Sequence, residues 1–147
     1  MPEVVGFENG LPTTGNIHSV SGQLIGLNLY SPRDTHVFST SVISSPNLDG
    51  VLLSYNNSSI AWDVWQFEPS LQYYRDRNPQ GSANQRWTPG LRVTYRGWQR
   101  WAVESNITYE LGRASRLTVD PNDSTSTTTT RESANRVNYS LGARYEF

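Results

Sequence analysis

The chain has 147 residues and a formal net charge of −1, and 35% of its residues are hydrophobic and 12% aromatic. This near-neutral charge provides no basic surface of the kind that binds nucleic acid. The absence of cysteine excludes disulfide bonds and thiol chemistry. No apolar run approaches the roughly 18 residues that a membrane-spanning helix needs. Many aromatic but few aliphatic residues are typical of a sheet with one face in lipid and the other in water.

Residues 1–18 are predicted to be an N-terminal loop or linker with room for one short strand, because Gly6, Gly10, Pro12 and Gly15 interrupt them. Residues 19–147 are predicted to form β-strands. They show no helical period, and Ser, Thr, Asn and β-branched residues dominate. The predicted strands are Val20–Tyr30, Thr35–Ser44, Val51–Tyr55, Ala61–Tyr74, Arg86–Arg96, Gln99–Gly112 and Arg136–Phe147.

The predicted connections alternate in length. Those at 31–34, 56–59 and 97–99 are short turns. Those at 45–50, 76–85 and 113–134 are longer, and the last contains a Ser/Thr run at 124–130. Short turns on one side and long loops on the other are typical of transmembrane barrels, although a soluble meander can show the same alternation.

An aromatic residue recurs eight positions after another in four of the strands. Eight residues of strand span roughly 26 Å, or about 20 Å of depth at a tilt of about 40°, close to a lipid band bordered by two aromatic girdles. The core of a soluble β-sandwich would also place aromatic residues on one face. The predicted aromatic girdle consists of Trp65, Tyr73, Trp87, Tyr95, Trp101, Tyr109, Tyr139, Tyr145 and Phe147.

The alternate positions of the same strands are polar and carry both charges, which favours mutual ion pairing over a ligand site. A register that sets Tyr95 opposite Trp101 would place Arg92 opposite Glu104, with a hairpin loop at 97–99. The first three strands do not reveal their sides, because apolar residues occupy both sets of alternate positions. The predicted lumen-facing polar residues are Glu68, Arg92, Arg96, Glu104, Glu110 and Arg144.

No catalytic, metal or cofactor site is predicted. His18 and His36 lie at or near strand starts. A catalytic pairing of His36 with a serine is conceivable, but serines are so frequent in this chain that such a pairing carries little weight. The carboxylates show no metal-ligand spacing, and no glycine-rich phosphate loop is present. The chain is therefore predicted not to be an enzyme.

The last predicted strand, RVNYSLGARYEF, alternates apolar and polar residues throughout and ends on Phe147. This ending resembles the C-terminal signal of bacterial outer-membrane β-barrels, which the barrel-assembly machinery reads. Residues 60–147 resemble the barrels that follow tetratricopeptide repeats in exopolysaccharide or surface-protein export proteins. The resemblance implies a location in the bacterial cell outer membrane, with lipid, the assembly machinery and an exported polymer as partners.

The predicted fold is all-β: an antiparallel up-and-down transmembrane β-barrel of about eight strands, or the C-terminal strands of a larger barrel. The predicted function is a pore or export conduit. A small plugged barrel serving as an anchor or adhesion scaffold stays open as an alternative. A third hypothesis is a soluble barrel that binds an apolar ligand, and it requires Trp65, Trp87 and Trp101 to face inward.

Overall fold

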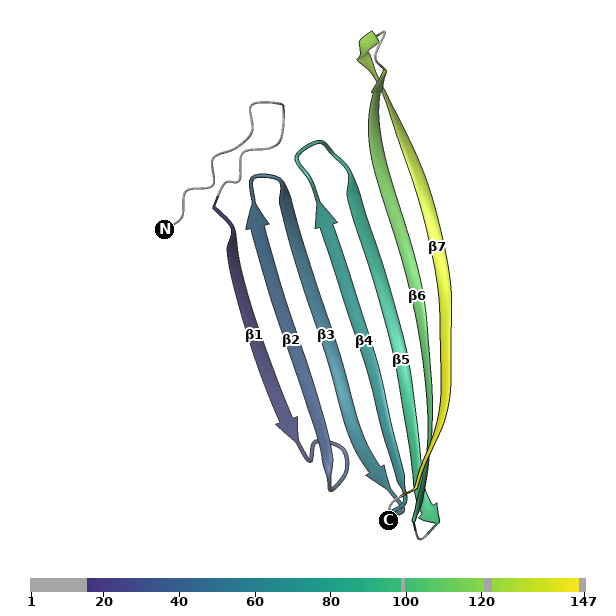
Figure 1. The fold of residues 1–147 in the computed structure, drawn as a ribbon. Helices are drawn as coiled ribbons and strands as arrows, with labels where there is room; N and C mark the ends of the chain where they lie inside the picture. Colours follow the sequence, from purple (N-terminus) through teal and green to yellow (C-terminus); the bar gives the residue numbers. More distant parts are fainter. Residues whose placement is uncertain (1–15, 99, 121–122, 146–147) are drawn as a thin grey trace, which may run out of the picture.

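The computed structural model describes residues 16–98, 100–120 and 123–145. These residues form one sheet of seven antiparallel strands in sequence order, joined as an up-and-down meander (Figure 1). The all-β, antiparallel, up-and-down prediction is therefore confirmed. The sheet is open, because β1 and β7 are its two edges and do not pair. The strands are β1 (His18–Leu27), β2 (Asp34–Ser45), β3 (Leu48–Ala61), β4 (Trp65–Arg77), β5 (Ala83–Trp98), β6 (Trp101–Asp120) and β7 (Asp123–Tyr145).

The two ends of the sheet differ. The turns β1–β2, β3–β4 and β5–β6 lie at the end where β7 finishes, here named the C-terminal end (Figure 1). The other three hairpins turn at the opposite end, here named the distal end. The strands lengthen from 10 residues in β1 to 23 in β7, and the β6–β7 hairpin projects beyond the others at the distal end.

The register assigns every strand to its faces, because directly opposed residues of an antiparallel pair point to the same side. The apolar face of β4 continues through Leu71 to Tyr55 of β3, then to Phe38 of β2 and Leu24 of β1. Gln23, Ile25 and Leu27 of β1 fall on the opposite, polar face. The pairing thus settles the sides of the first three strands, which the alternation alone left open.

The predicted connections at 45–50, 56–59 and 113–134 are wrong. The first is reduced to residues 46 and 47, between β2 and β3. The turn predicted at 56–59 lies inside β3, and the chain turns instead at Trp62 and Asp63, whose φ angles of 49° and 59° are left-handed. The long loop predicted at 113–134 is a paired extension of β6 and β7, with Leu117 opposite Thr129. Threonine is β-branched and favours strands once a partner strand is present. A Thr-rich run is therefore compatible with either a loop or a strand when only the sequence is considered.

The predicted register of β5 and β6 is wrong by two residues. Tyr95 lies opposite Val103 rather than Trp101, and Arg92 lies opposite Asn106 rather than Glu104. β5 continues into the predicted 97–99 loop as far as Trp98, which lies opposite Trp101, and a bulge between Tyr95 and Trp98 shifts the register by one more residue. A shift of two residues leaves every side chain on its predicted face.

Neither face of the sheet is covered. Ala102 is the one buried hydrophobic residue in the part of the chain that the structure describes. Sheets in soluble domains bury one face against a second layer. The large apolar side chains of this sheet are instead exposed along its whole apolar face, so the described residues form no core of the sandwich kind.

Candidate membrane-facing surface and polar face

The predicted girdle residues come together in cross-strand pairs on the apolar face. The ring centroids of Trp65 and Tyr95 are 4.6 Å apart, and those of Tyr73 and Trp87 are 4.4 Å apart. Contacts at these separations stabilise aromatic pairs beyond the area that they bury. The first pair lies near the C-terminal end of the sheet, and the second lies eight residues, or four alternate positions, nearer the distal end.

The aromatic residues of β6 and β7 continue this arrangement obliquely. Trp101 contacts Tyr145, with centroids 5.0 Å apart, one position closer to the C-terminal end than the Trp65–Tyr95 pair. Tyr109 and Tyr139 share the apolar face. A line of aromatic residues oblique to the strands is what tilted strands require for a level girdle. Phe147, the remaining predicted girdle residue, lies outside the described residues.

The apolar face has a hollow that extends over β1–β5. Gly22 and Thr40 lie opposite each other there, between larger apolar side chains. The hollow measures about 570 Å³ and is open to the surroundings. Its lining includes Leu24, Phe38 and Leu53. The small side chains therefore leave a depression in the apolar face but do not make it polar.

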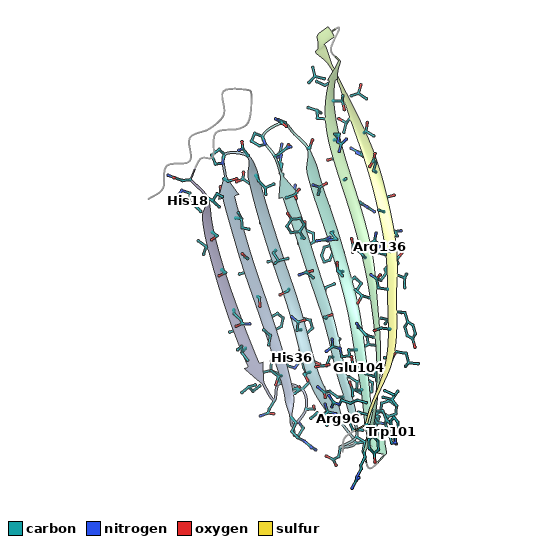
Figure 2. All side chains as sticks on the ribbon, viewed as in Figure 1. His18, His36, Arg96, Trp101, Glu104 and Arg136 are labelled. Atoms are coloured by element: carbon teal, nitrogen blue, oxygen red, sulfur yellow. The ribbon has the colours of Figure 1, made fainter. Side chains whose placement is uncertain are left out.

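Ion pairs organise the polar face. Arg92 of β5 lies between two carboxylates, with Nη1 3.6 Å from Oε2 of Glu68 and Nε 3.3 Å from Oε1 of Glu104. Arg86 pairs with Glu110 at 3.5 Å. Four of the six predicted lumen-facing residues therefore take part in pairing with charges of opposite sign, as the sequence suggested. Figure 2 shows Glu104 toward the C-terminal end of the sheet.

The other two predicted lumen-facing residues lie close to the C-terminal end. Arg144 of β7 is opposite Ala102 on the polar face. Arg96 is exposed and lies beside the bulge in β5, where its backbone amide donates a hydrogen bond to the carbonyl of Val64 at 2.8 Å. The bulge interrupts the alternation there, so Arg96 is not aligned with the charged residues of the regular strand.

The polar face becomes apolar beside β1. Ile25 lies opposite Val37 on this face, and Leu27 lies one position further toward the C-terminal end. The exposed fractions of Ile25 and Leu27 are 57% and 63%. Exposed apolar side chains grouped on an otherwise hydrophilic face are characteristic of surfaces that contact another segment or molecule.

A buried polar network that the sequence did not reveal fixes the β1–β2 turn. Asp34 and His36 are 2% and 4% exposed in a sheet that buries little else. The Asp34 carboxylate accepts backbone hydrogen bonds from Leu29, Tyr30 and Ser31 at 2.7–2.9 Å. The sequence feature that could have indicated this network is the aspartate directly after the turn, because aspartate side chains accept hydrogen bonds from nearby turn amides.

His36 is held at both ring nitrogens. Its Nε2 lies 3.1 Å from the Asp34 carboxylate, and its Nδ1 lies 2.9 Å from the hydroxyl of Tyr55. With Nε2–H donating to the carboxylate, Nδ1 of the neutral ring accepts from the tyrosine. Asn57 packs beside the ring and donates to the carbonyl of Thr35 at 3.1 Å. The two ring nitrogens of His36 therefore contact Asp34 and Tyr55, and neither is hydrogen-bonded to a serine among the described residues.

Asp34 makes the turn sensitive to acid. Burial by itself would raise the pKa of its carboxyl, but the amides of Ser31 and Tyr30 donate to it and lower that pKa. His36 and the Leu29 amide act in the same direction, and the resulting pKa is about 2 against an ordinary value of 3.8. Because the folded-state pKa is the lower one, this stabilisation is complete above about pH 4 and is lost as the pH falls toward 2.

Asp34→Asn should therefore unfold at a lower temperature than the parent chain at neutral pH, because an amide nitrogen cannot accept the turn hydrogen bonds. The difference in midpoint temperature between the two proteins should shrink as the pH falls from 4 to 2 and should vanish below pH 2. Thermal unfolding in detergent, followed by circular dichroism across this pH range, measures the difference. A difference that does not change with pH would contradict the assignment.

Comparison of the chain with protein-family models, with curated protein sequences and with solved structures finds no match. Within the described ranges, no helix is long and apolar enough to cross a membrane. The same residues contain no group of three potential metal ligands.

Proposed function

We propose that this chain is an outer-membrane β-barrel protein that acts as a pore or export conduit for a hydrophilic cargo. One observation carries the proposal: a continuous apolar face has aromatic pairs toward both ends, and the opposite face is polar with paired charges. Lipid would contact the first face, where aromatic rings favour the two interfaces. Water and cargo would contact the second, whose mixed charges favour no single ionic sign.

The direction of the edge strands constrains how such a barrel closes. β1 and β7 run the same way, because five strands of alternating direction separate them (Figure 1). An all-antiparallel barrel therefore requires an odd number of further strands between these edges. The edges are suited to pairing: Leu24 and Leu141 are 69% and 67% exposed, against 38% for Leu91 in the sheet interior. An unpaired edge strand is a template for another strand.

A plugged barrel is the second candidate, and the apolar residues on the polar face favour it. Ile25, Leu27 and Val37 would meet water in an open lumen. A plug or a filled lumen beside β1 and β2 would cover them, and the chain would then serve as an anchor or adhesion scaffold. The ion pairs around Arg92 suit either a filled or a wet lumen.

Heat-modifiable gel migration tests the proposal. The full chain is refolded in detergent micelles and, separately, in buffer, and each sample is run with and without heating. A folded band that requires detergent and disappears on heating is expected. Folding in buffer alone would contradict the membrane proposal and favour the soluble ligand-binding barrel, with Trp65, Trp87 and Trp101 inside. No compact band in either condition would show that these strands need further strands to fold.

A further inference from the structure

Arginines follow the distal aromatic row on the apolar face. Tyr73, Trp87 and Leu111 lie side by side across β4, β5 and β6. One alternate position further toward the distal end, the same three strands carry Arg75, Gln85 and Arg113. The next alternate position on β4 carries Arg77. These three residues are here named the arginine belt: Arg75, Arg77 and Arg113.

The belt concentrates positive charge. Neighbouring strands are about 4.8 Å apart and alternate residues about 6.7 Å apart, so the three Cα positions fit within about 12 Å. All three side chains are exposed, and none forms an ion pair with a described residue. Asp49, opposite Arg77, is the one carboxylate among the described side chains at this height of the face, and it accepts a hydrogen bond from Ser44.

We infer that the arginine belt binds phosphate groups of lipid headgroups. Guanidinium groups bind phosphate oxygens through paired hydrogen bonds. Aromatic rows mark the height of the membrane interface, and the next residues outward are at headgroup height. The belt lies directly outward of Tyr73 and Trp87, on the side that lipid would contact. The inference rests on the proposed function, since only a membrane-embedded sheet presents this face to lipid.

Trp87 is a natural reporter for the belt. It is 41% exposed on the apolar face, next to the belt, whereas Trp62, Trp65 and Trp101 lie at the C-terminal end of the sheet. Figure 2 marks the position of Trp101 at that far end. Bromine on a lipid acyl chain quenches nearby indole fluorescence. The part of the quenching that Trp87→Phe removes therefore reports on lipid beside the belt.

The experiment places the full chain in phosphatidylcholine vesicles that contain a minor fraction of brominated phosphatidic acid. Quenching of Trp87 should exceed the value for brominated phosphatidylcholine at the same fraction. Each of Arg75→Gln and Arg113→Gln should lower this lipid preference about fivefold, the factor expected for one arginine at a membrane surface. Arg116→Gln is the matched control, because Arg116 is also distal and exposed but lies on the opposite face.

Three outcomes would overturn the inference. Equal quenching by the two brominated lipids, with no effect of Arg75→Gln or Arg113→Gln, would leave the sheet in the membrane without a phosphate preference. Displacement by inorganic phosphate at matched ionic strength would assign the belt to a soluble anion. An absence of quenching by any brominated lipid would contradict the proposed function itself, and the inference would fall with it.

Discussion

Leu91→Arg is expected to prevent stable insertion of the sheet in a bilayer. Leu91 lies on the apolar face between Pro69 and Ile107 and is 38% exposed. It is four residues from both Trp87 and Tyr95 on its own strand, so it lies midway between the two girdles. An arginine near the middle of the lipid band costs about 2–4 kcal/mol, a large part of the stability of an ordinary domain.

Thr108→Arg is the matched control, because it places the same side chain on the polar face of the neighbouring strand, one cross-strand pair away from Leu91. Thr108 lies beside Gly90 and Asn138, which leaves room for a longer side chain that can reach water. It should change the free energy of unfolding by about 0.5 kcal/mol or less, as substitutions at wet surface positions usually do. Denaturant titration of both variants in vesicles compares them. The reverse ranking would mean that the faces are inverted, and equal costs would exclude a lipid-covered face.

The sequence predicted the faces of β4 to β7 well, because one set of alternate residues in those strands is consistently apolar. In β1 it could not do so, since Leu24 and Ile25 are neighbours and both apolar. Only pairing with β2 decides between them, and pairing is a property of residues far apart in the chain. The paired extension at 113–134 was missed for the same reason: Thr129 is polar, and its strand state depends on Leu117 across the hairpin.

The candidate surfaces were predictable to different degrees. The girdle could be found from spacing alone, because an eight-residue interval lies within one strand. The ion pairs of Arg92 were anticipated despite the wrong register, since Glu104 is within reach diagonally. The arginine belt was not, because Arg75 and Arg113 are brought to the same cross-strand row only by the strand between them. The network at Asp34 depends on turn geometry, with φ of 55° at Asn28, which the residue types do not specify.

Arg92→Glu is expected to destabilise the folded sheet by about 2 kcal/mol, because it removes two half-exposed ion pairs of roughly 1 kcal/mol each. It also groups three carboxylates, which adds repulsion. The side chains of Arg92 and Glu104 are 49% and 51% exposed, and that of Glu68 is 30% exposed. The exchange variant Arg92→Glu with Glu104→Arg restores one attraction and should recover part of the loss. Urea unfolding of the parent chain, the two single variants and the exchange variant completes the double-mutant cycle.

The salt dependence of the coupling energy between Arg92 and Glu104 distinguishes a water-filled lumen from a plugged one. In a wide, water-filled lumen the coupling between Arg92 and Glu104 should weaken as ionic strength rises, because the Debye length falls from about 10 Å at 0.1 M to about 3 Å at 1 M. In a plugged lumen the pairs are shielded from the electrolyte, and the coupling should change little. Loss of coupling at high salt therefore favours the conduit, whereas a salt-independent coupling favours the plugged scaffold that Ile25 and Leu27 also suggest. A coupling of zero at every ionic strength would mean that the charges on the polar face do not organise it at all.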